Sequence, residues 1–105
     1  EMMHKSTKAT MISKKVKETV YKRDKGECVI CHMPGIPNAH VVRRSQLGMG
    51  IEQNIVCLCP VCHRRFDQDK NPEVRDGCYV RIVAHLKSFY PDWNRDDMIY
   101  RKGGA

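Results

Sequence analysis

Residues 54–67, NIVCLCPVCHRRFD, contain an apolar run, a pair of cysteines and a histidine in direct succession. The apolar run at 55–58 is typical of a short buried strand. Pro60 suits the first position of a helix, which we expect to continue to about Gln68. The sequence therefore predicts a strand that leads through CPVC directly into a helix, and this unit organises the centre of the chain.

A second cysteine pair, CVIC at residues 28–31, completes a set of four with the pair in CPVC. Two ligands on a tight turn and two on the first turn of a helix can converge on one tetrahedral zinc ion. The predicted ligands are Cys28, Cys31, Cys59 and Cys62. Because all four ligands come from the protein, the ion has no open position and its predicted role is structural. Cys57 and Cys78 are expected to be ordinary buried cysteines.

The segments around the two cysteine pairs predict an α+β fold. Ser13 is a suitable N-cap for a helix that ends near Arg23. The turn-rich stretch MPGIPN is expected to be a loop, and the segment 39–42 is expected to form a strand that pairs with 55–58. A cysteine knuckle, a hairpin and a helix carrying the second cysteine pair follow one another in the order of a treble clef.

A C-terminal helix is expected to begin after its N-cap Asn71 and to end before Pro91. Its apolar stripe at helical spacing consists of Cys78, Ile82, Leu86 and Phe89. A chain of 105 residues has room for one compact domain. We assign residues 1–12 to a flexible basic arm, 13–91 to the domain with its C-terminal helix, and 92–105 to a tail without clear periodicity.

Charge is distributed unevenly along the chain, whose formal net charge is +7. Residues 1–30 contain eight Lys and Arg against four Asp and Glu, whereas the chain after residue 66 balances at seven against seven. A basic part beside a neutral part suggests a polyanionic partner, of which nucleic acid is the commonest. A solvated lysine-rich surface would have the same composition.

The chain has no run of about 18 apolar residues that could span a membrane, and no secretory signal segment. We therefore expect a soluble cytoplasmic protein without a membrane partner. In a reducing cytoplasm, cysteines in CxxC pairs are metal ligands more often than disulfides.

Three further residues stand out by type and spacing: His40, Asn54 and His63. Together with CVIC, NAHVVRRSQLGMG and NIVCLCPVCHRRFD, they make the chain resemble the HNH endonucleases, also called ββα-metal or His-Me finger nucleases. The resemblance extends from Glu27 to about Asp67 and is closest to small phage-type members with four zinc-binding cysteines. It implies hydrolysis of DNA phosphodiester bonds that leaves 5′-phosphate and 3′-hydroxyl ends.

The resemblance also implies a role for each residue. His40 matches the general base, which takes a proton from the attacking water. Asn54 matches the residue that ties the hairpin loop in place. His63 matches the helical ligand of a catalytic divalent ion, Mg²⁺ or Mn²⁺, and Asp67 lies one helical turn further on, where some members have a second ligand.

One position departs from the family pattern. Many members have Asp or His immediately before the general base, as a metal ligand on the strand, whereas this chain has Ala39. In an alternative alignment His40 is itself the strand ligand and no base is assigned. A different class of function is also open, namely a zinc-finger module that binds DNA or protein without catalysis.

Four arginines flank the proposed site and suit contacts with DNA phosphates: Arg43, Arg44, Arg64 and Arg65. The alternative is that they form a solubilising surface. The expected partner is double-stranded DNA in a bacterial or phage-infected cell. By resemblance alone, phage DNA-packaging machinery is a further candidate partner.

Overall fold

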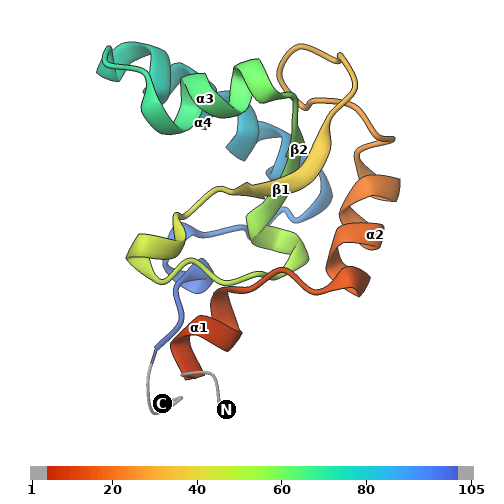
Figure 1. Cartoon of the computed structure of the whole chain (residues 1–105), viewed down its shortest axis with the longest axis vertical. Helices are drawn as coiled ribbons and strands as arrows, with labels where there is room; N and C mark the ends of the chain where they lie inside the picture. The colour runs from red at the N-terminus through yellow and green to blue at the C-terminus, as the bar shows by residue number, and fades with distance from the viewer. Residues whose placement is uncertain (1–4, 102–105) are drawn as a thin grey trace.

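A two-stranded antiparallel sheet lies at the centre of the structure, which is a computed structural model that describes residues 5–101 (Figure 1). Strand β1 (Ile36–His40) pairs with β2 (Ile55–Leu58), with Ala39 opposite Val56 and an irregularity in register between Ile36 and Ala39. The chain leaves β2 and enters helix α3 (Pro60–Gln68) through the second cysteine pair, as the sequence predicts. The fold is therefore α+β with a central hairpin.

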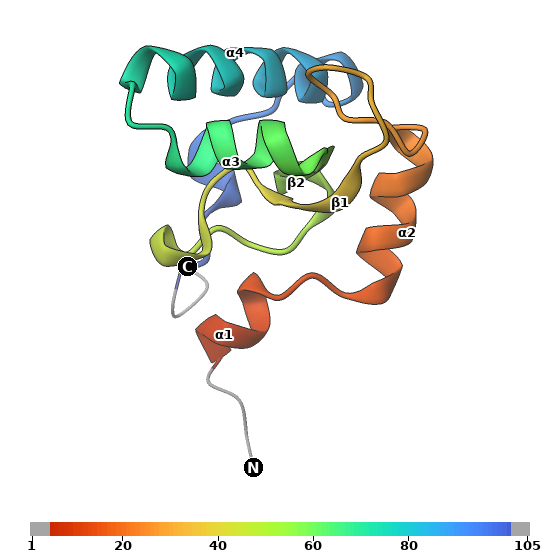
Figure 2. The same cartoon turned by 45° about the horizontal axis from the view of Figure 1, so that its top comes forward.

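Helix α4 (Pro72–Phe89) packs against α3, and α2 (Lys14–Arg23) lies beside the sheet (Figure 2). The predicted N-caps of α2 and α4 and the predicted start of α3 are confirmed. The Ser13 hydroxyl accepts from the backbone N–H of Val16 at 3.1 Å, and the Asn71 side chain accepts from Glu73 at 2.9 Å. Pro60 occupies the first turn of α3, where its missing N–H costs nothing. None of the helices within residues 5–101 is long and apolar enough to cross a membrane.

Strand β2 is buried on both faces, which explains why it is a continuous apolar run. Val56 and Leu58 belong to the main core, together with Ile82 and Leu86 of α4. The alternate residues of β2 pack beneath α2 in a smaller cluster with Val20. Cys57 and Cys78 are buried, as predicted.

The predicted first strand was placed too late in the chain. The structure has the strand at Ile36–His40, so the end of the turn-rich stretch MPGIPN belongs to it, and Val41 and Val42 lie beyond its end. The register irregularity before Ala39 accommodates Pro37, which has no N–H to donate to a partner strand. Val41 and Val42 are nevertheless buried.

Both predicted terminal segments are more structured than their sequences suggest. Helix α1 (Lys5–Thr10) occupies half of the predicted arm, while residues 1–4 lie outside the described part. In the predicted tail, Trp93 and Met98 are buried in the core. Of the predicted apolar stripe of α4, Cys78, Ile82 and Leu86 are buried, whereas Phe89, the last residue of the helix, is 47 % exposed.

Asp24, just after α2, is the centre of a buried polar network that has no local pattern in the sequence. Its side chain is fully buried and lies 2.7 Å from both Arg23 and His85, and it accepts from the backbone N–H of Cys57 at 3.0 Å. Burial opposes ionisation of this carboxylate, but its hydrogen-bonding partners outweigh that effect and lower its pKa to about 2. The network joins α2, β2 and α4.

Asp24→Asn is expected to lower the free energy of unfolding by about 3–5 kcal/mol. The buried guanidinium of Arg23 would remain desolvated in this variant but would lose the negative charge that compensates it. Urea unfolding of the zinc-loaded protein at pH 7 measures this. The pKa of Asp24 lies below the ~3.9 of an unfolded aspartate, so its contribution is complete above about pH 4 and is lost as the pH falls towards 2. Asp92→Asn, at an exposed position, is the control, and an equal loss in both variants contradicts the prediction.

Candidate metal centre and active site

The four predicted cysteine ligands converge. Their sulfur atoms all lie within 4.8 Å of one another, and the Sγ atoms of Cys31 and Cys59 are 3.6 Å apart. In a tetrahedral site with Zn–S bonds of about 2.3 Å, sulfur atoms lie about 3.8 Å apart. The cluster therefore has the dimensions to hold a metal ion such as zinc. Cys31 is exposed, whereas the other three cysteines are buried.

The first cysteine pair lies on a tight turn between α2 and β1. The backbone N–H of His32, which has a φ of 67°, donates to the carbonyl of Cys28 at 2.9 Å. Gly35 lies so close to this turn that a Cβ atom would be 2.7 Å from the backbone nitrogen of Cys28. The N–H of Val29 donates to the carbonyl of Cys57 at 3.0 Å and thereby attaches the turn to β2.

The second pair belongs to the first turn of α3. Cys59 is the N-cap, and its sulfur accepts from the backbone N–H of Cys62 at 3.4 Å. Burial and the sulfur atoms of Cys59 and Cys28 raise the pKa of Cys62. At Cys28 burial acts in the same direction, but nearby backbone N–H groups outweigh it and lower the pKa to about 7. A metal ion bound among the four sulfur atoms would favour their deprotonated form.

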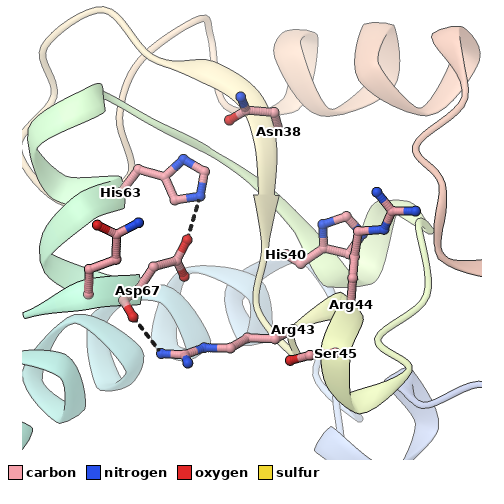
Figure 3. Close-up of a pocket in the computed structure, with 8 residues that line it drawn as sticks. Asn38, His40, Arg43, Arg44, Ser45, His63 and Asp67 are labelled. Atoms are coloured by element: carbon pink, nitrogen blue, oxygen red, sulfur yellow. Dashed lines mark hydrogen bonds and ion pairs between the residues drawn. The ribbon is translucent and has the colours of Figure 1, made fainter.

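A cleft of about 370 Å³ lies between β1 and α3 (Figure 3). It is lined by Asn38, His40, Arg43, Arg44, Ser45, His63, Asp67 and Gln68. The structure thus brings His40 and His63 to one cavity from two different elements. Arg64 borders a neighbouring hollow that shares His63 with the cleft, whereas Arg65 borders a hollow further along α3. Of the four predicted arginines, only Arg43 and Arg44 line the cleft itself.

His40 is partly buried, and its ring is held by a short contact with the backbone. Its Nε2 lies 2.7 Å from the backbone carbonyl oxygen of Thr10. Because a carbonyl only accepts, Nε2 carries the hydrogen, and in the neutral ring Nδ1 is left with a free lone pair. Burial, assisted by the charge of Arg44, lowers the pKa of His40 against the opposing effect of the Thr10 carbonyl. His40 is therefore neutral at pH 7.

The carbonyl that holds His40 comes from the end of α1, in the segment that the sequence analysis treated as an arm. Thr10 is only 4 % exposed, and the adjacent Ala9 carbonyl accepts from the N–H of Gly50 at 3.0 Å. A Cβ atom on Gly50 would lie 2.0 Å from the carbonyl oxygen of Met11. Sequence reasoning missed this contact because a backbone carbonyl has no signature in residue type.

Asn54, directly before the start of β2, has no solvent exposure. Its side-chain oxygen accepts from the N–H of Val42 at 2.9 Å. Its amide nitrogen donates to the carbonyls of Val42 at 3.1 Å and Met49 at 2.8 Å. The Asn54 side chain therefore fastens the loop between the two strands from inside.

His63 and Asp67 lie one turn apart on α3, and Nε2 of His63 is 2.9 Å from a carboxylate oxygen of Asp67. Both side chains are about one-third exposed to the cleft. Within residues 5–101, the four cysteines are the only group of three or more His, Cys, Asp or Glu side chains placed to hold one metal ion. His40, His63 and Asp67 do not form such a group.

Comparison with protein-family models, with curated proteins and with solved structures finds no match for this chain. The chemistry of the candidate site therefore has to be inferred from the residues that form it. It consists of a four-cysteine cluster that can hold a metal ion such as zinc, next to a cleft with two histidines, a carboxylate and two arginines.

Proposed function

We propose that this chain is a metal-dependent DNA endonuclease of the HNH type, with a treble-clef ββα centre around a structural zinc ion. The observation that carries the proposal is the arrangement of His40, His63 and Asn54. The two histidines face one cleft from the strand and the helix, and Asn54 anchors the loop between the strands. A zinc module that binds DNA or protein without catalysis does not need two histidines on one cleft together with a buried asparagine.

In the proposed reaction, Nδ1 of His40 takes a proton from a water molecule that attacks the scissile phosphorus. The Thr10 carbonyl orients the ring and keeps the hydrogen on Nε2. Nδ1 is therefore unprotonated and can accept the proton of the attacking water. The lowered pKa of His40 keeps the base neutral at physiological pH.

His63 and Asp67 are the residues that would hold a catalytic Mg²⁺ or Mn²⁺. Adjacent ligand atoms in an octahedral site with bonds of about 2.1 Å lie about 3.0 Å apart, and the His63–Asp67 distance of 2.9 Å fits this spacing. When bound, such an ion supplies positive charge at the scissile phosphate and the leaving 3′-oxygen.

The test of the proposed function is cleavage of supercoiled plasmid DNA by the zinc-loaded protein, with and without added Mg²⁺ or Mn²⁺. We expect relaxed or linear DNA only when the divalent ion is present. DNA binding without cleavage under every metal condition would favour the alternative, a non-catalytic zinc-finger module.

Replacing Arg43 and Arg44 together with glutamine should weaken binding to duplex DNA and flatten its dependence on salt. Each lost phosphate contact reduces the slope of log affinity against log salt by about 0.9. Titrations at several salt concentrations, without added divalent ion, measure the slope. Replacing Arg81 and Lys87 of α4, which do not line the cleft, removes the same charge as a control. Equal slopes for the two double variants would show that only the net charge of the protein affects DNA binding, and that Arg43 and Arg44 do not contact phosphates in the cleft.

A further inference from the structure

We propose that Asn38 is the strand ligand of the catalytic divalent ion, in place of the Asp or His that the family pattern has at position 39. This inference rests on the proposed nuclease function. It assigns the third protein ligand of a site in which only His63 and Asp67 are so far identified.

The conformation of β1 decides which side chain is available. Ala39 is fully buried in the main core and is paired with Val56. Side chains alternate along a strand, so Asn38 and His40 are both directed away from the core side that Ala39 occupies. Asn38 is exposed and lines the same cleft as His63 and Asp67. A ligand at position 39 would have to leave the core, whereas Asn38 already lines the cleft.

Figure 3 shows the direction of the side chains. The amide of Asn38 extends from β1 towards the side of the cleft that carries His63, while the ring of His40 lies on the other side of the strand, next to Arg44. His40 is also committed to the Thr10 carbonyl through Nε2. The geometry therefore separates the role of metal ligand from the role of general base. Asn38 is directed towards the proposed ligands His63 and Asp67, and His40 is available as the base.

The chemistry of the amide suits the ion. Mg²⁺ and Mn²⁺ prefer carboxylate, carbonyl and water oxygens, and the Asn38 side chain offers one carbonyl oxygen. With the imidazole of His63 and the carboxylate of Asp67 it makes three protein ligands, which leaves positions for water and a phosphate oxygen. A neutral amide adds no negative charge, so the site should bind the ion more weakly than one with aspartate.

The test is a calorimetric titration of the zinc-loaded full chain with Mn²⁺, followed by electron paramagnetic resonance of the bound ion. We expect Asn38→Ala to weaken Mn²⁺ binding at least ~10-fold, the size of loss seen when groups that support a metal ligand are removed. Asn38→Asp should tighten binding, because a carboxylate replaces the amide at the same position. Gln68→Glu adds the same charge to the same cleft from α3 and should change binding much less.

His63→Ala separates failure of this inference from failure of the proposed function. If His63→Ala weakens Mn²⁺ binding and both Asn38 variants bind as the wild type does, Asn38 is not a ligand although the metal site stands. If His63→Ala also leaves Mn²⁺ binding unchanged, the proposed catalytic metal site itself is wrong. If Gln68→Glu tightens Mn²⁺ binding as much as Asn38→Asp does, the tighter binding comes from the added negative charge in the cleft and not from coordination. The assignment of Asn38 as a ligand is then overturned.

Discussion

Cys62→Ser is expected to release the zinc ion and to unfold most of the domain. Cys62 is buried at the start of α3, and its sulfur lies within 4.8 Å of the other three. Binding of a structural zinc ion contributes ~10–16 kcal/mol to small zinc domains, as much as the whole stability of an ordinary domain. Elemental analysis of the purified protein and far-ultraviolet circular dichroism measure the two losses.

Cys78→Ser provides the matched control for this prediction. Cys78 is also buried, on α4, but lies outside the cluster of four sulfur atoms. The same substitution there should cost ~1–3 kcal/mol for a buried hydroxyl and leave the zinc content near one ion per chain. Wild-type protein purified without a tightly bound metal ion, or a Cys62→Ser variant that retains it, would contradict the structural role of the cluster.

His40→Ala is expected to lower the rate of plasmid cleavage by ~10²–10⁴-fold, the usual effect of a positioned general base. The variant should still fold, keep zinc and bind DNA, because His40 belongs neither to the cysteine cluster nor to the core. In the wild type, cleavage should fall with decreasing pH only below about 6.5, because the pKa of His40 is lowered and its neutral form is the base.

His63→Ala is the comparison that separates the base from the metal ligand. It should also lose cleavage, but its residual activity at saturating DNA should need much more Mg²⁺ or Mn²⁺ than the wild type needs. His40→Ala should leave the metal requirement nearly unchanged. If His40→Ala shifts the metal requirement in the same way, His40 is the strand ligand and the base is another group. If both variants cleave as the wild type does, the observed cleavage comes from a contaminant.

Gly50→Ala tests the support of His40 without altering any group in the cleft. The added Cβ would lie 2.0 Å from the Met11 carbonyl oxygen and must displace the segment that holds the Thr10 carbonyl. We expect cleavage to fall while zinc content and metal requirement stay at wild-type values. Unchanged cleavage would mean that His40 keeps its orientation without Thr10.

Strand β2 and helices α3 and α4 could be predicted from the sequence because their signals are local. Pro60 and Asn71 mark helix starts through their own backbone and side-chain chemistry, and the apolar run at 55–58 marks a buried strand. The convergence of the four cysteines could also be predicted, because CxxC spacing on a turn and a helix leaves few other arrangements.

Only the tertiary structure decided which groups surround the candidate site. The Thr10 carbonyl reaches His40 across 30 residues, and His85 reaches Asp24 across 61, so neither contact has a local pattern. Which face of β1 meets the core also depends on its pairing with β2: Ala39, opposite Val56, is buried, whereas Asn38 is exposed. Local residue chemistry determines where helices, strands and ligand pairs occur, whereas packing between distant segments determines which backbone carbonyl or strand face a functional side chain meets.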